Sequence, residues 1–158
     1  MRDYILLYIN GRRYKIKGKE AFLTCSEYLR TELHLTGTKI VCAEGDCGAC
    51  TVLWGPPFQP INSCIQFVYS LDASHIITVE GIRGEDEIHP IQEAMIKNFG
   101  AQCGYCTPGF ICALAGLFEG KNKITEKKIR NALTGNLCRC TGYVKIIASV
   151  KAAAEMAS

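Results

Sequence analysis

The stretch CAEGDCGAC, residues 42–50, carries three cysteines separated by four and then by two residues. It belongs to a longer segment, TGTKIVCAEGDCGAC (residues 36–50), which is rich in glycine and has neither helical nor strand periodicity. We therefore expect a loop that presents three thiols. Cys64 follows Cys50 after a further thirteen residues and supplies a fourth.

The spacing C-x4-C-x2-C with a distant fourth cysteine is that of plant-type [2Fe-2S] sites. The candidate ligands are Cys42, Cys47, Cys50 and Cys64. Four thiolates and a cluster concentrate negative charge, which backbone N–H groups directed at the sulfur atoms can offset. Gly45, Gly48 and Ala49 would let the backbone come that close. A zinc site is the weaker interpretation here, because the ferredoxin loop matches this spacing better.

A second set of four cysteines lies in the segments QCGYCTPG (residues 102–109) and GNLCRCTGY (residues 135–143). The candidate ligands are Cys103, Cys106, Cys138 and Cys140. A disulfide between Cys138 and Cys140 would be strained, because one residue separates them. Each pair precedes an expected helix, and two helix N-termini would present partial positive charge to an anionic cluster. Four thiolates can also bind zinc, so zinc remains an alternative at this second site.

The remaining cysteines and the histidines are interpreted as structural. Cys25 and Cys112 fall in expected helices, where free cysteine usually behaves as a small apolar core residue. His34, His75 and His89 are isolated from one another in the sequence, and none forms a Cys-x-His pair typical of a Rieske centre.

Composition narrows the class of protein. The 158 residues are 48% hydrophobic, which is enough for one domain or two small ones. The formal charge is +3, and the basic residues are scattered, which argues against a nucleic-acid or membrane surface. The N-terminal apolar run is too short for a membrane span and lacks a signal cleavage site, so we expect a cytoplasmic protein. In a reducing compartment, ten cysteines indicate metal binding rather than a disulfide framework.

The first half has the pattern of a small mixed sheet. Strands are expected at residues 4–9, 14–16, 51–54, 61–65 and 75–79. Asn10-Gly11 predicts a hairpin between the first two strands. The segment Thr24-Cys25-Ser26-Glu27 is a capping box, and it should open a helix that ends near His34.

The second half has the pattern of helices. Helices are expected at residues 90–99, 108–119, 125–133 and 143–156. Four helices of this size favour a compact bundle, and the charged stretch at residues 81–88 is the expected linker. The sequence thus predicts an α+β protein with a sheet domain at residues 1–80 and an all-α four-helix bundle domain at residues 81–158.

Three motifs together are similar to those of one known family. Residues 42–53 (CAEGDCGACTVL), 102–109 and 135–143 resemble the iron-sulfur subunit of the xanthine oxidase family of molybdenum hydroxylases. The resemblance extends over essentially the whole chain. It implies a plant-ferredoxin-like β-grasp domain followed by a four-helix bundle, each holding one [2Fe-2S] cluster.

The resemblance also implies partners and a direction of electron flow. Electrons would pass from a molybdopterin centre to the cluster of Cys103, Cys106, Cys138 and Cys140, then to the cluster of Cys42, Cys47, Cys50 and Cys64, and finally to FAD. Gln102 and Cys140 would contact the molybdopterin. The implied partners are a molybdopterin-binding large subunit and an FAD-binding medium subunit, in a dimer of heterotrimers. No substrate-transforming residue is expected on this chain, and the substrate is set by another chain.

One feature departs from the family, and two other functions stay open. Residues 54–60 (WGPPFQP) form a longer turn than many relatives have, which leaves open the partner surface that this turn meets.

A free two-cluster ferredoxin is the second hypothesis for the function, although the near-neutral charge offers little electrostatic steering. A zinc-stabilised interaction domain is the third, and metal content would distinguish it.

Overall fold

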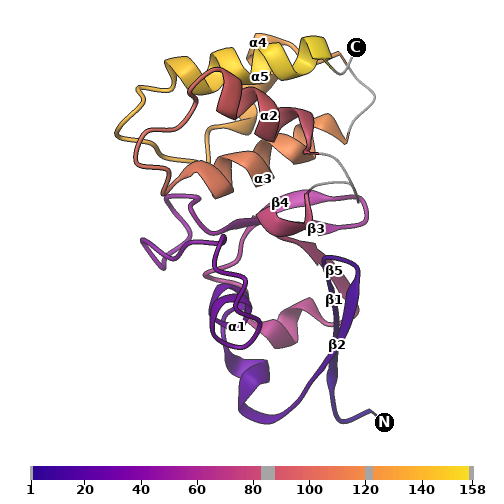
Figure 1. The fold of residues 1–158 in the computed structure, drawn as a ribbon. Helices are drawn as coiled ribbons and strands as arrows, with labels where there is room; N and C mark the ends of the chain where they lie inside the picture. The colour runs from indigo at the N-terminus through magenta and orange to yellow at the C-terminus, as the bar shows by residue number, and fades with distance from the viewer. Residues whose placement is uncertain (1, 83–87, 120–122, 157–158) are drawn as a thin grey trace.

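A mixed five-stranded sheet forms the first half of the chain in the computed structural model, which describes residues 2–82, 88–119 and 123–156 (Figure 1). The strands are β1 (Ile5–Ile9), β2 (Arg12–Ile16), β3 (Thr51–Gly55), β4 (Gln59–Asn62) and β5 (Ser74–Ile77). Their order is β2-β1-β5-β3-β4. The β1–β5 pair is parallel, and the other pairs are antiparallel. The predicted α+β class is confirmed.

Local signals in the sequence position the first elements as predicted. Asn10 and Gly11 have φ angles of 49° and 78°, and they join β1 to β2 in a hairpin. Helix α1 (Cys25–Thr31) begins at the predicted capping box, where the Glu27 N–H donates to Thr24 Oγ1 at 3.3 Å. The helix ends at Thr31 rather than near His34, whose φ of 56° is left-handed and cannot continue a right-handed helix.

The later strands differ in their bounds from the prediction. The return strand expected at residues 61–65 is β4, which begins at Gln59 because the pairing with β3 extends up to the turn. Strand β5 ends at Ile77, where a strand to Val79 was expected. Three short 3-10 helices were not predicted, since segments this short carry no periodic signal. They are η1 (Gly18–Phe22), η2 (Val68–Leu71) and η3 (Val79–Gly81).

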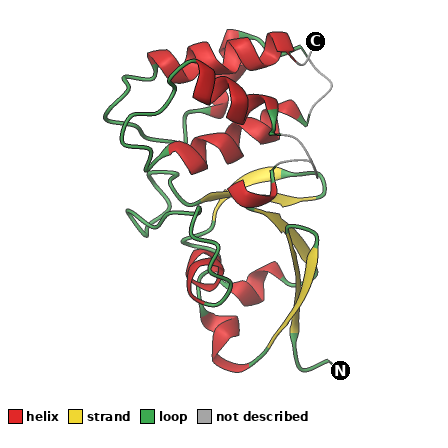
Figure 2. Ribbon diagram, in the orientation of Figure 1, coloured by secondary structure: helices red, strands yellow, loops and turns green. Residues whose placement is uncertain are grey.

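Within the described residues, the second half contains four α-helices (Figure 2). They are α2 (Pro90–Lys97), α3 (Thr107–Phe118), α4 (Glu126–Ala132) and α5 (Val144–Met156). Each bound lies within two residues of its prediction. The predicted linker at residues 81–88 falls largely outside the described residues. None of the helices in the described ranges is long and apolar enough to cross a membrane.

The buried apolar residues form two clusters, one in each half. The first gathers Leu7, Val52 and Ile76 of the sheet around Leu29 of α1. The second gathers residues of all four later helices, including Phe110 of α3. Helix α3 also packs against β3 and β4 of the sheet (Figure 1). The division into domains at residues 1–80 and 81–158 remains a prediction, as does the four-helix bundle.

Candidate iron-sulfur sites

The first four cysteines come from the loop between α1 and β3 and from the segment after β4. Cys50 and Cys64 are buried, whereas Cys42 and Cys47 are partly exposed. Burial, followed by the neighbouring thiol of Cys50, raises the pKa of Cys64 to about 12, and Cys42 lies near enough to add to the effect. These contacts bring together thiols that are far apart in the sequence.

Backbone amides of the loop point at the sulfur of Cys42. The Cys47 N–H donates to Cys42 Sγ at 3.4 Å. This bond, together with backbone hydrogen bonds from Glu44 and Asp46, lowers the pKa of Cys42 to about 6. The loop therefore stabilises a thiolate at this position without any basic side chain.

Gly45 allows this loop to fold closely over the segment that carries Cys64. Its φ is +82°, and a Cβ placed there would lie 2.7 Å from Cδ1 of Ile65. The Asn62 side chain donates to the Gly45 carbonyl. A side chain at position 45 would therefore strain the backbone and push Ile65 away.

The second four cysteines line one cavity of about 260 Å³. Cys103 Sγ lies 3.6 Å from Cys140 Sγ. The thiols of Cys106 and Cys138 are also in contact, and burial followed by this neighbour raises the pKa of Cys106 to about 12. The four cysteines that the sequence singled out in the second half therefore share a single cavity.

Thr141 lies directly beside this cavity. Its Oγ1 is 3.1 Å from Cys138 Sγ. Burial opposes a charged thiolate at Cys138, but hydrogen bonds from the Thr141 hydroxyl and backbone outweigh that effect and lower the pKa of Cys138. Thr141 was expected only to form part of a turn, since nothing in the sequence pattern marks its hydroxyl as a neighbour of a thiol.

Gln102 and Cys140 lie at the exposed edge of the second site. Both residues are exposed, and Gln102 directly precedes Cys103, whose sulfur is the one near Cys140. A partner that reached one of these two residues would therefore be placed beside the other.

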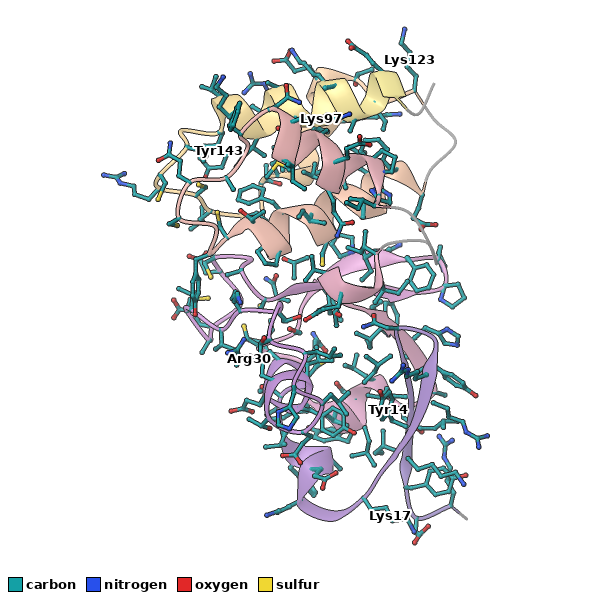
Figure 3. The ribbon with its side chains drawn as sticks, viewed as in Figure 1. Tyr14, Lys17, Arg30, Lys97, Lys123 and Tyr143 are labelled. Atoms are coloured by element: carbon teal, nitrogen blue, oxygen red, sulfur yellow. The ribbon has the colours of Figure 1, made fainter. Side chains whose placement is uncertain are left out.

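The loops of the two sites are in direct contact. The Leu137 N–H donates to the Cys47 carbonyl at 3.0 Å. The buried Asn136 side chain donates to the Gly48 carbonyl at 2.8 Å and lies 3.2 Å from Thr51 Oγ1. Figure 3 shows sulfur atoms gathered where the loops of the two halves meet. Sequence reasoning missed Asn136, because its partners are far away along the chain.

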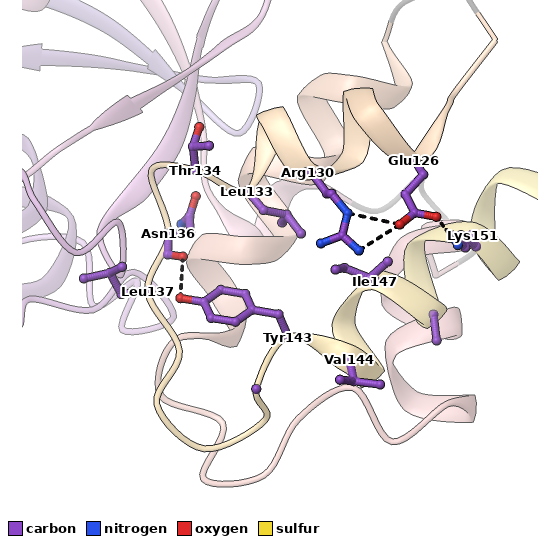
Figure 4. A pocket seen from close by; sticks show the side chains of 12 residues that line it. Glu126, Arg130, Leu133, Thr134, Asn136, Leu137, Tyr143, Val144, Ile147 and Lys151 are labelled. Carbon is purple, nitrogen blue, oxygen red and sulfur yellow. Dashed lines mark hydrogen bonds and ion pairs between the residues drawn. The ribbon is translucent and has the colours of Figure 1, made fainter.

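A larger pocket of about 600 Å³ lies beside the second site, between α4, α5 and the segment that joins them (Figure 4). Its rim carries Glu126, which pairs with Arg130 at 2.8 Å and with Lys151 at 2.5 Å. Its inner wall includes Tyr143, whose hydroxyl lies 3.5 Å from the Asn136 carbonyl. None of the residues that line this pocket is a cysteine, although Leu137 lines both this pocket and the cavity of the second site.

The other two cysteines and the histidines belong to neither set, although Cys25 lies near Cys50 of the first set. Cys25 and Cys112 are 0% and 1% exposed, as expected for core residues. Burial raises the pKa of both thiols. His75 stacks on Tyr8 with ring centroids 4.6 Å apart, and His89 caps α2. The buried positions of Cys25 and Cys112 agree with the core roles expected for them.

The donor sets suit a two-iron cluster. The second-site thiols are arranged as two contacting pairs, Cys103 with Cys140 and Cys106 with Cys138. A [2Fe-2S] cluster takes four thiolates spread over two irons. The chemistry of the residues present therefore fits this group.

The fold and the thiol sets thus define an α+β iron-sulfur protein, and comparisons with known proteins give its family. Residues 78–151, which contain all four second-set cysteines, match the family described as "[2Fe-2S] binding domain". Xanthine dehydrogenase 1 of Arabidopsis thaliana is 43% identical over 152 residues, which cover 90% of this chain and 11% of that protein. Aldehyde oxidase 4 of Cavia porcellus is 39% identical over 158 residues, which cover 94% of this chain and 12% of that protein.

Solved structures agree with these relatives. A chain of quinoline 2-oxidoreductase from Pseudomonas putida 86 matches with a TM-score of 0.84 and 32% identity, covering 98% of this chain and 94% of that one. Aldehyde oxidoreductase from Desulfovibrio gigas matches with a TM-score of 0.88 and 33% identity, covering 97% of this chain and 17% of that one. The chain belongs to the iron-sulfur domains of the xanthine dehydrogenase and aldehyde oxidase family. It spans about a tenth of the length of the two curated relatives.

Proposed function

We propose that this chain is the electron-transfer component of a molybdenum-containing hydroxylase or dehydrogenase. It would pass electrons between a molybdopterin centre and FAD, each held by a partner subunit. Membership of an oxidoreductase family supports this role. The substrate would be transformed on the molybdopterin-binding partner, and this chain would supply the redox path away from it.

The eight cysteines would hold two [2Fe-2S] clusters, which when bound supply one-electron redox chemistry. The first set is Cys42, Cys47, Cys50 and Cys64, and the second set is Cys103, Cys106, Cys138 and Cys140. The chain itself contributes thiolates, hydrogen bonds to sulfur and exclusion of water. The backbone bonds at Cys42 and the cavity shared by the second set support this assignment.

The observation that carries the proposal is the hydrogen bond from the Leu137 N–H to the Cys47 carbonyl, at 3.0 Å. Cys47 belongs to the first set, and Leu137 is bonded to Cys138 of the second. A continuous path from one set to the other therefore crosses a single hydrogen bond. This short connection supports electron exchange between the two sites.

The exposed edge at Gln102 and Cys140 supports an orientation for the complex. We place the molybdopterin of the large subunit at this edge and the FAD of the medium subunit nearer the first set. The heterotrimer, and its assembly into a dimer of heterotrimers, are part of this proposal.

Anaerobic purification with metal analysis and EPR spectroscopy tests the proposal. We expect about four irons per chain and two distinct EPR signals after dithionite reduction. Cys64→Ala should remove one signal and Cys140→Ala the other, whereas Cys112→Ala, which alters a buried thiol outside both sets, should keep both. Molybdenum and flavin subunits should co-purify. Zinc in place of iron, or one signal that survives both ligand substitutions, would refute the proposal.

A further inference from the structure

A side-chain hydroxyl lies against one thiol of the second set. Thr141 Oγ1 is 3.1 Å from Cys138 Sγ, and Cys138 is 8% exposed. Cys138 is thus a buried residue whose sulfur has the hydroxyl as a close polar neighbour. Hydrogen bonds to ligand sulfur and exposure to solvent are two of the factors that set the potential of an iron-sulfur cluster.

The surrounding bonds determine the direction of this hydrogen bond. The Tyr143 N–H donates to Thr141 Oγ1 at 3.2 Å, which occupies a lone pair of the hydroxyl oxygen. The hydroxyl proton stays free to be donated. A thiolate that binds iron has no proton and can only accept. With the cluster bound, Thr141 is thus the donor and Cys138 the acceptor.

The turn that carries Thr141 is held in place from several sides. The Cys138 N–H donates to the Tyr143 hydroxyl at 3.1 Å. The Tyr143 ring packs edge-on against Phe110, with centroids 6.1 Å apart. Backbone N–H groups of Thr141 and Cys140 also bond to the Cys138 sulfur, and a side-chain substitution leaves these in place. The Thr141 hydroxyl is therefore a donor that one substitution can remove selectively.

We propose that Thr141 is a positioning residue for electron transfer, whose hydroxyl bond to Cys138 raises the reduction potential of the second site. Reduction adds one electron, supplied by the reduced molybdenum partner, and Thr141 keeps its proton throughout. The added negative charge strengthens the O–H···S bond, so the bond stabilises the reduced form more than the oxidised form. This inference rests on the proposed function, and it explains how the chain favours electron uptake at its entry point.

A redox titration of the holoprotein followed by EPR tests this inference. Thr141→Val should make reduction of the second site about tenfold less favourable, which is a shift of about 59 mV to more negative potential for a one-electron couple. Thr141→Ser keeps the hydroxyl and should titrate close to the wild type. The first site should titrate identically in all variants, which provides an internal reference.

Two further variants distinguish the effect of losing the Thr141 hydroxyl from the effect of disturbing the turn. Thr141→Ala also lacks the hydroxyl and should shift in the same direction as Thr141→Val. Tyr143→Phe removes the bond to the Cys138 N–H but keeps Thr141, so its shift should be clearly smaller. The inference is wrong if Thr141→Val titrates like the wild type, if Thr141→Ser shifts equally, or if neither Val nor Ala loads the second site. A wild type without a second signal would instead refute the proposed function.

Discussion

Within the first set, the thiols of Cys42 and Cys64 differ in acidity because their surroundings differ. Backbone hydrogen bonds lower the pKa of Cys42 to about 6, whereas burial raises that of Cys64 to about 12. At neutral pH, Cys42 is thus ready to bind metal, while Cys64 releases its proton as metal binds.

His89 gives the fold a dependence on pH. Its Nδ1 accepts the Ile91 N–H at 3.2 Å, which requires a neutral imidazole. Burial lowers the pKa of His89, and the carboxylate of Glu119 opposes this only in part. The unfolded chain therefore takes up more protons than the folded chain once the pH falls below about 6.5. We expect the contribution of neutral His89 to the free energy of unfolding to be complete above that pH and to be lost progressively as the pH falls below it.

Urea denaturation of the wild type and of His89→Asn across this pH range measures the effect. Asparagine is a good capping residue and does not titrate in this range. The variant therefore removes the titrating imidazole but keeps a helix cap. The wild type should lose more stability on acidification than His89→Asn does. Parallel pH profiles for the two proteins would show that His89 does not titrate with folding.

Elements governed by neighbouring residues could be predicted from the sequence. The hairpin at Asn10-Gly11 and the cap at Thr24 depend on residues within a few positions, and both are confirmed. The parallel pairing of β1 with β5 depends on contacts between residues far apart in the chain, and no local pattern predicts it. The same limit applies to the sites: cysteine spacing indicated the two sets, but the contacts of Asn136 and Thr141 emerge only in the folded chain.

The junction between the loops of the two sites depends on the amide of Asn136. Asn136→Asp keeps the shape of the side chain but replaces the donor with an acceptor facing the Gly48 carbonyl. We expect a loss of about 1–3 kcal/mol in the free energy of unfolding, because a buried donor is removed and the new carboxylate oxygen has no proton to offer the Gly48 carbonyl. Hydrogen exchange at the Leu137 amide, which bonds to Cys47, should become faster.

Asn98→Asp is the matched control for that substitution. The Asn98 amide donates to the Ala94 carbonyl at 2.9 Å, within the end of α2 and away from the junction. This variant should leave exchange at Leu137 unchanged, as measured by mass spectrometry. If both variants accelerate exchange at Leu137 equally, the effect is a general loss of stability, and the junction does not depend on Asn136.

At the scale of the whole molecule, Leu53 of β3 lies between the two hydrophobic clusters. Leu53 is 2% exposed but belongs to neither cluster. Helix α3 faces this side chain. A Cβ atom placed at Gly116 of α3 would lie 3.1 Å from Cδ2 of Leu53, so the helix and the sheet are in close contact here. Unfolding of one half would expose this apolar contact in the other, which couples the stabilities of the two halves.

Leu53→Ala should weaken that coupling, whereas Leu7→Ala should not. Both remove a buried leucine and should cost about 2–5 kcal/mol, but Leu7 lies inside the cluster of the sheet half. Trp54, the single tryptophan, reports on the sheet by its fluorescence, and far-UV circular dichroism reports mainly on the helices of the second half. In anaerobic urea denaturation, the two probes should separate for Leu53→Ala and remain coincident for Leu7→Ala. Coincident transitions in both variants would mean that contacts other than Leu53, such as those of Asn136, hold the halves together.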